Sequence, residues 1–152
     1  LLAQVPFGFY LVSLEFSSDR IELDNIHIFV GITIFYFTLF RLIWKLINPS
    51  PTETKSFFKG QVFIGKANHF LLYVSIFTIT ISGILKKLYM GETLNFIFFK
   101  FGFKKDNFIL ADVYYDVHVY ANYLLLALVT LHILAVATHH FIFKDNILKK
   151  IL

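Results

Sequence analysis

The segment VHVYANYLLLALVTLHILAVATHH, residues 117–140, contains no Lys, Arg, Asp or Glu, yet it carries four histidines. A helix that crosses the hydrocarbon core of a bilayer needs about 20 predominantly apolar residues, so this segment is long enough to span a membrane. Of the 152 residues in the chain, 57% are hydrophobic and only 16% are charged, unlike an ordinary soluble domain. The sequence therefore predicts a helical membrane protein.

Further apolar blocks predict an all-α fold, a transmembrane four-helix bundle formed by a single domain over residues 1–152. The first block is too short to span. Because no basic segment precedes it and no small-residue cleavage site follows it, we interpret it as the second half of a helix. The connection at 88–112 is interrupted by lysines and is expected to lie partly along the membrane interface. The helices are expected at about 1–16 (partial), 26–47, 67–85 and 114–143.

The polar segment SSDRIELDN, residues 17–25, is predicted to be a loop that supplies Asn25 as the cap of the second helix. That helix is expected to end before Pro49 and Pro51, because proline cannot continue a helix. Eight Lys and Arg residues fall on the side of the 41–66 connection and six on the other, which favours termini on the cytoplasmic side.

Charge and cysteine content exclude several classes of function. The net charge is +4, but the basic residues are spread between apolar blocks and form no continuous stripe, so nucleic-acid binding is excluded. The chain has no cysteine, which excludes disulfides, thiolate-bound iron–sulfur clusters and covalent haem attachment through a C-x-x-C-H motif. Any redox centre must therefore be held by histidine.

Histidines within the apolar segments are candidates for a functional site. Ionisable side chains are costly inside a bilayer and usually face the bundle interior, although a lone histidine can simply hydrogen-bond across a helix interface. His118 and His132 are 14 residues apart, which places them on nearly the same helix face at depths that differ by about 21 Å. They form one stripe at two depths.

His27 and His118 are each expected just below the outer surface, two residues after Asn25 and Asp116 respectively. They can therefore face each other across the bundle. Two neutral imidazoles suit the iron of a haem, and the apolar porphyrin edge suits the surrounding Phe, Leu and Ile. Zinc is the rival metal, but neither cysteine nor an intramembrane Asp or Glu is available in helices two to four to complete a tetrahedral site. The pattern favours haem b.

Several segments carry a family resemblance: NIHIFVGITIFYFTLFRLIWKLINPSP, NHFLLYVSIFTITISG, the histidine pair, and HILAVATHHFIFKDNILKKIL, whose last fifteen residues are the most specific. From about Phe16 onward the chain resembles the bacterial cytochrome b561 family of four-helix, di-haem inner-membrane cytochromes. The resemblance implies that His27 and His118 bind an outer haem b and that His132 binds one axial side of an inner haem b. In that family a histidine near the start of the first helix supplies the other axial ligand. This sequence has none before His27, so that ligand is expected upstream of Leu1.

His69 is expected at a depth close to that of His132. It could bind a haem propionate, contact quinone or replace the missing axial ligand; a role in fixing its neighbour is preferred. His139 and His140 lie about 31 Å beyond His118, which makes them poor haem ligands. Their role is either structural or in quinone binding and proton exchange.

Gly31 follows His27 by one turn, and its missing side chain would let a porphyrin lie close to the helix; simple helix packing is the alternative. Arg41 lies at the inner end of the second helix. It either pairs with a haem propionate or a quinone, or it only satisfies the excess of positive charge on the cytoplasmic side.

These patterns predict a membrane cytochrome that carries single electrons across the bilayer and exchanges them with the quinone pool on the cytoplasmic side. The resemblance implies a superoxide:quinone oxidoreductase activity. Independently of it, the positive charge of Arg20, Lys86 and Lys87 at the outer side could attract a small anion such as superoxide. A haem-bearing membrane-anchor subunit of a larger respiratory complex, with a redox partner subunit, is the alternative. A histidine-lined transporter is a third interpretation. In all three, membrane lipid surrounds the bundle.

Overall fold

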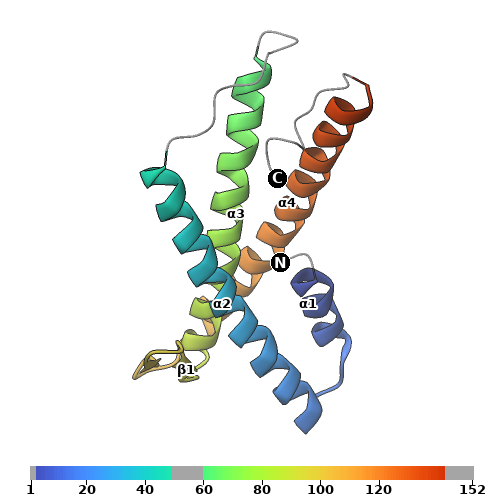
Figure 1. Ribbon diagram of the computed structural model, residues 1–152. Helices are drawn as coiled ribbons and strands as arrows, with labels where there is room; N and C mark the ends of the chain where they lie inside the picture. Colours follow the sequence, from blue (N-terminus) through green and yellow to red (C-terminus); the bar gives the residue numbers. More distant parts are fainter. Residues whose placement is uncertain (1–2, 49–59, 143–152) are drawn as a thin grey trace.

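The computed structural model describes residues 3–48 and 60–142, and within these ranges it is mostly helical (Figure 1). The predicted all-α membrane architecture is confirmed, because three of the helices are long and apolar enough to cross a membrane. A short helix precedes them, and a two-stranded antiparallel hairpin joins the last two. The elements are α1 (Gln4–Ser13), α2 (Ser18–Ile47), α3 (Gln61–Tyr89), β1 (Leu94–Asn95), β2 (Lys100–Phe101) and α4 (Phe108–Phe141).

The start of α2 corrects the prediction of a loop at residues 17–25. Ser17 is the N-cap, since its side chain accepts a hydrogen bond from the backbone N–H of Arg20 at 3.2 Å, and Asp19 lies in the first turn. A serine cap followed by an acidic residue stabilises a helix start. Asn25 therefore lies two turns inside α2 and is not its cap. Pro49 and Pro51, expected to end this helix, lie outside the described residues.

The helices α3 and α4 begin six residues before the apolar blocks that predicted them, at Gln61 and Phe108. Asn107 caps α4 by accepting a hydrogen bond from the backbone N–H of Leu110 at 3.1 Å. Polar residues in these terminal turns are compatible with a helix because the turns can extend beyond the hydrocarbon core. The hairpin between the helices is held against α2, where the Tyr36 hydroxyl donates to the Phe96 carbonyl at 3.1 Å.

The core is small and lies where α1 meets α3 and α4. Val5 of α1 packs with Ile79 of α3 and with Ala121 and Leu125 of α4, and Leu125 is fully buried. Many large apolar side chains elsewhere on α2, α3 and α4 are exposed, as expected for helices whose solvent is lipid. Figure 1 shows α1 beside the lower half of the bundle, at the end that carries the hairpin; we call this the hairpin end.

Candidate haem-binding sites

His27 of α2 and His118 of α4 face each other near the hairpin end. Their ring centroids are 6.3 Å apart, with 68° between the ring planes. A metal ion held between two imidazoles needs two metal–nitrogen bonds of about 2 Å, and each nitrogen lies about 1 Å from its ring centre. The two centroids would then be about 6 Å apart. The spacing of this pair therefore fits iron ligation from both sides.

Each ring of this pair has a nitrogen available for a ligand. The Nδ1 of His118 lies 2.8 Å from the carbonyl oxygen of Ile79. Because a carbonyl only accepts, Nδ1 carries the proton and Nε2 keeps its lone pair. The Nδ1 of His27 is buried and has no hydrogen-bond partner among the described residues. A buried polar atom without a partner is costly, and a bound group would remove that cost.

Two glycines that the sequence analysis did not single out lie against these rings. A Cβ at Gly83 of α3 would be 3.0 Å from Nδ1 of His118, and one at Gly8 of α1 would be 3.2 Å from Cε1 of His27. Either contact would push the ring away. Gly31, which was predicted to admit a porphyrin, has open space where its Cβ would be, with no atom within 4 Å. The open space at Gly31 is compatible with a flat group beside α2, whereas Gly8 and Gly83 show that the two rings pack closely against α1 and α3.

A second pair lies toward the opposite end, where His69 of α3 meets His132 of α4. Their ring centroids are 5.0 Å apart. That is about 1 Å shorter than ligation of one ion from both sides requires, so the two rings contact each other directly. This geometry favours His69 as a neighbour of His132 over the role of opposite axial ligand.

Asn68 is the functional candidate that sequence reasoning missed. Its side-chain amide lies 3.2 Å from Nδ1 of His132. Either the amide nitrogen donates to an unprotonated Nδ1 or the amide oxygen accepts from a protonated one, and only the second leaves Nε2 of His132 free for iron. A polar amide in a membrane-spanning segment indicates a functional site in the same way as a histidine does. Asn68 could therefore have been identified from the motif ANHF.

The remaining predicted residues surround the second pair less closely. His139 Nε2 lies 3.0 Å from the amide nitrogen of Gln61, which links the ends of α3 and α4, while His140 is exposed beside Phe141. Arg41 is exposed on α2. The structure therefore gathers these groups at one end of the bundle without bringing them into a single contact set.

The basic residues at the hairpin end have separate environments. Lys87 of α3 forms ion pairs with Asp24 of α2 and with Glu92, the latter at 2.8 Å. Lys86 instead lies over the ring of Tyr115, with its Nζ 4.9 Å from the ring centroid. Two carboxylates balance the charge of Lys87, so Lys86 offers more attraction to an incoming anion. Asp24 also ties α2 to α3 one turn before His27.

Within residues 3–48 and 60–142, no group of three or more His, Cys, Asp or Glu side chains is arranged to hold a metal ion. The donors come as histidine pairs. A porphyrin supplies four ligands of its own, and an iron in it needs only axial ligands from the protein. The fold defines a helical membrane protein, and in it the His27–His118 pair has the spacing that ligation of one ion from both sides requires.

Comparison with known proteins identifies the family. The family model of prokaryotic cytochrome b561 matches residues 1–152, and the chain belongs to this family. The chain is also 27% identical over 149 residues to cytochrome b561 homolog 2 of Escherichia coli (strain K12), an alignment that covers 95% of this chain and 79% of that protein. The chain is thus a bacterial membrane cytochrome of the b type that takes part in electron transfer, and a b-type haem is implied.

Proposed function

We propose that this chain is a di-haem cytochrome that carries single electrons across the bacterial inner membrane and exchanges them with the quinone pool. The observation that carries the proposal is the His27–His118 pair, whose ring separation of 6.3 Å suits iron between two imidazoles. His118 and His132 both belong to α4, and their spacing supports a second haem site deeper along the same helix face.

His27 and His118 would hold one haem b, and His132 would help to hold the second. When bound, haem supplies an iron that takes up and releases one electron at a time. The protein supplies orientation and tuning. The Ile79 carbonyl fixes His118, because its hydrogen bond to Nδ1 sets the tautomer and the ring orientation. At the second site Asn68 has the corresponding position beside His132.

Quinone exchange is proposed at the end that carries the second pair. His69, His139, His140 and Arg41 all lie toward this end. Imidazoles can donate hydrogen bonds to a quinone headgroup and carry its protons, and both are needed because quinone reduction takes up protons. The exposure of His69 and His140 makes them accessible from the membrane.

Superoxide oxidation is the finer part of the proposal and concerns the hairpin end. Superoxide is a small anion, and cationic side chains near a redox centre raise its local concentration. Lys86 has this position, because it follows Gly83, which lies against His118, by one turn of α3. Lys87 contributes less, since Asp24 and Glu92 neutralise it.

The proposal is tested in proteoliposomes that contain the purified haem-loaded protein and a quinol. Substitution of His139 or His140 by Gln is expected to slow haem reduction by quinol severalfold and to leave the optical spectra of the haems unchanged. Lys86→Gln should leave quinol oxidation unchanged and slow haem reduction by superoxide. If the rate of haem reduction by quinol responds to Lys86→Gln and not to the histidine substitutions, the quinone binds at the hairpin end and the proposal is wrong. Co-purification of a second, haem-reducing subunit in stoichiometric amount would favour the anchor-subunit function.

A further inference from the structure

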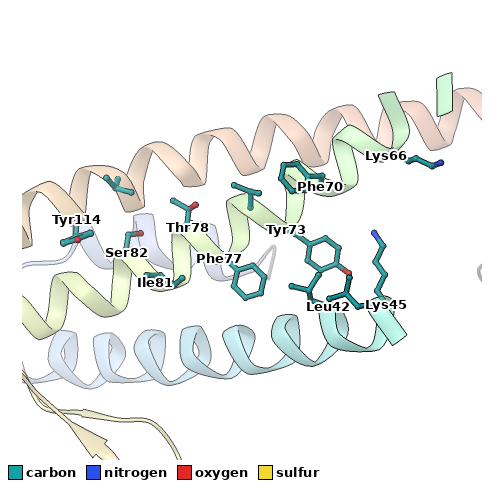
Figure 2. A pocket seen from close by; sticks show the side chains of 13 residues that line it. Leu42, Lys45, Lys66, Phe70, Tyr73, Phe77, Thr78, Ile81, Ser82 and Tyr114 are labelled. Carbon is teal, nitrogen blue, oxygen red and sulfur yellow. The ribbon is translucent and has the colours of Figure 1, made fainter. Parts of the chain in front are cut away.

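A groove of about 720 Å³ runs along α3 between α2 and α4 (Figure 2). Its volume lies within the range of about 300–1,000 Å³ that is typical of ligand sites. Apolar and aromatic side chains, including Phe70, Phe77 and Ile81 of α3 and Leu42 of α2, form most of its wall. The groove is therefore suited to a long apolar group.

The groove lies on a different face of α3 from the histidine pairs. At 100° per residue, Phe70, Phe77 and Ile81 share one face, whereas Ile79 and Gly83 lie roughly on the opposite one. Ile79 packs into the core and Gly83 contacts His118, so that opposite face points to the bundle interior. Most of the groove therefore lies on another face of α3 than Ile79 and Gly83, and only Ser82 and Val117 of its lining are next to Gly83 and His118 in the chain.

One end of the groove is cationic. Lys45 of α2 and Lys66 of α3 line it there, and Figure 2 shows both side chains at the same end. The Nζ of Lys45 lies 5.2 Å from the centre of the Tyr73 ring, which holds this ammonium group at the mouth of the groove. Two lysines at the head of an apolar channel match a molecule with one anionic head and a long hydrocarbon tail.

We propose that this groove binds an anionic phospholipid, with the phosphodiester between Lys45 and Lys66 and an acyl chain along Phe70, Phe77 and Ile81. The walls are helices long and apolar enough to span a membrane, so the groove opens to lipid. Basic pockets between transmembrane helices are suited to anionic headgroups. A quinone carries no fixed charge to match the lysines, and a second copy of the chain would need an anionic feature at this depth.

The test uses the haem-loaded protein in vesicles made of equal parts phosphatidylcholine and phosphatidylglycerol. After extraction in detergent, the phosphatidylglycerol that stays bound per chain is measured by mass spectrometry. The double variant Lys45→Gln/Lys66→Gln is expected to retain about 25-fold less phosphatidylglycerol than the unaltered chain, since each lysine near the headgroup contributes about fivefold and the two factors multiply. The matched control Lys104→Gln/Lys105→Gln removes the same charge from exposed positions outside the groove and should retain the normal amount.

A second variant tests the channel itself. Val74→Trp adds volume inside the groove without changing charge, and it should lower retention of both lipids. Lys45→Arg/Lys66→Arg should restore phosphatidylglycerol, and unchanged haem spectra confirm folding in each variant. Equal retention in the Lys45/Lys66 and Lys104/Lys105 variants would overturn the proposal. Displacement of the lipid by added ubiquinone would also overturn it and would identify the groove as a quinone site. A change from dimer to monomer in Val74→Trp would overturn it as well and would identify the groove as a contact between two copies of the chain.

Discussion

Each histidine pair joins α4 to another helix, α2 for His27–His118 and α3 for His69–His132, but the two pairs are held in place differently. At the hairpin end the main chain does the positioning: a backbone carbonyl holds His118, and glycines at 8 and 83 leave room for the rings. At the other end, side chains do it, because the Asn68 amide and the His69 ring contact His132. The first site is therefore difficult to retune by substitution of its hydrogen-bond partner, whereas the second can be retuned by changing one side chain.

The largest effect is expected from removing the imidazole of His118. His118→Ala deletes one side of the pair spaced at 6.3 Å, so the protein should lose one haem per chain while the helices stay folded. A pyridine haemochrome assay measures the haem content, and circular dichroism measures the helices. An unchanged haem count in a folded His118→Ala protein would remove the assignment of this pair.

The glycines provide a sharper version of the comparison. Gly83→Ala places a Cβ 3.0 Å from Nδ1 of His118, so the ring must move and its bond to Ile79 weaken. We expect haem affinity at this site to fall by about tenfold, the lower end of what outer-shell changes cost. Gly65→Ala is the matched control, since its Cβ on the same helix meets open space and the helix gains about 0.5–1 kcal/mol. Equal haem loss in both variants would show that glycine flexibility, not ring contact, is responsible.

A smaller and more local effect is expected at the second pair. Asn68→Leu removes the hydrogen bond to His132, which is worth about 1 kcal/mol, or about 40 mV for a one-electron couple. The midpoint potential of one haem should rise by that order, because a histidine without its acceptor is a weaker donor to iron. Potentiometric titration should show the other haem unchanged, and Asn68→Gln should restore part of the shift. A shift in both haems, or in neither, would contradict the role of Asn68.

The smallest effect concerns the ion pairs of Lys87 with Asp24 and Glu92 beside the His27–His118 pair, which we call the clamp. Lys87→Gln leaves Asp24 and Glu92 without their partner, and the ion pairs are partly buried, so we expect a loss of about 1–2 kcal/mol in stability. Lys86→Gln, which only removes a contact with Tyr115, should cost less. Thermal unfolding in one detergent compares them. A larger loss for Lys86→Gln would mean that the clamp does not hold α2 to α3.

Spacing and hydropathy were sufficient to predict the helical membrane fold and the approach of His27 to His118, because both depend on helical periodicity and depth. They failed at residues 17–25. Polar residues there were interpreted as a loop, but Ser17 and Asp19 form a helix start. Apolarity locates the part of a helix that lies in lipid, not the turns that extend beyond it.

The contacts of Gly8, Gly83 and Asn68 could not be predicted in the same way. The sequence does not indicate which glycine lies against a ring of another helix, because this depends on how closely the two helices approach each other. Asn68 carried a signal, as a polar group in an apolar segment, but its partner depends on the rotation of α3 against α4. Tertiary packing decides both.

The central claim is that the His27–His118 pair ligates iron and that His69 does not. The most direct measurement is the haem content per chain together with the low-spin electron paramagnetic resonance signals of His27→Ala and His69→Ala, purified side by side. The account predicts that His27→Ala loses one haem and its low-spin signal, while His69→Ala keeps every haem with at most a shifted signal. Loss of a haem in His69→Ala, with the full content retained in His27→Ala, would contradict it.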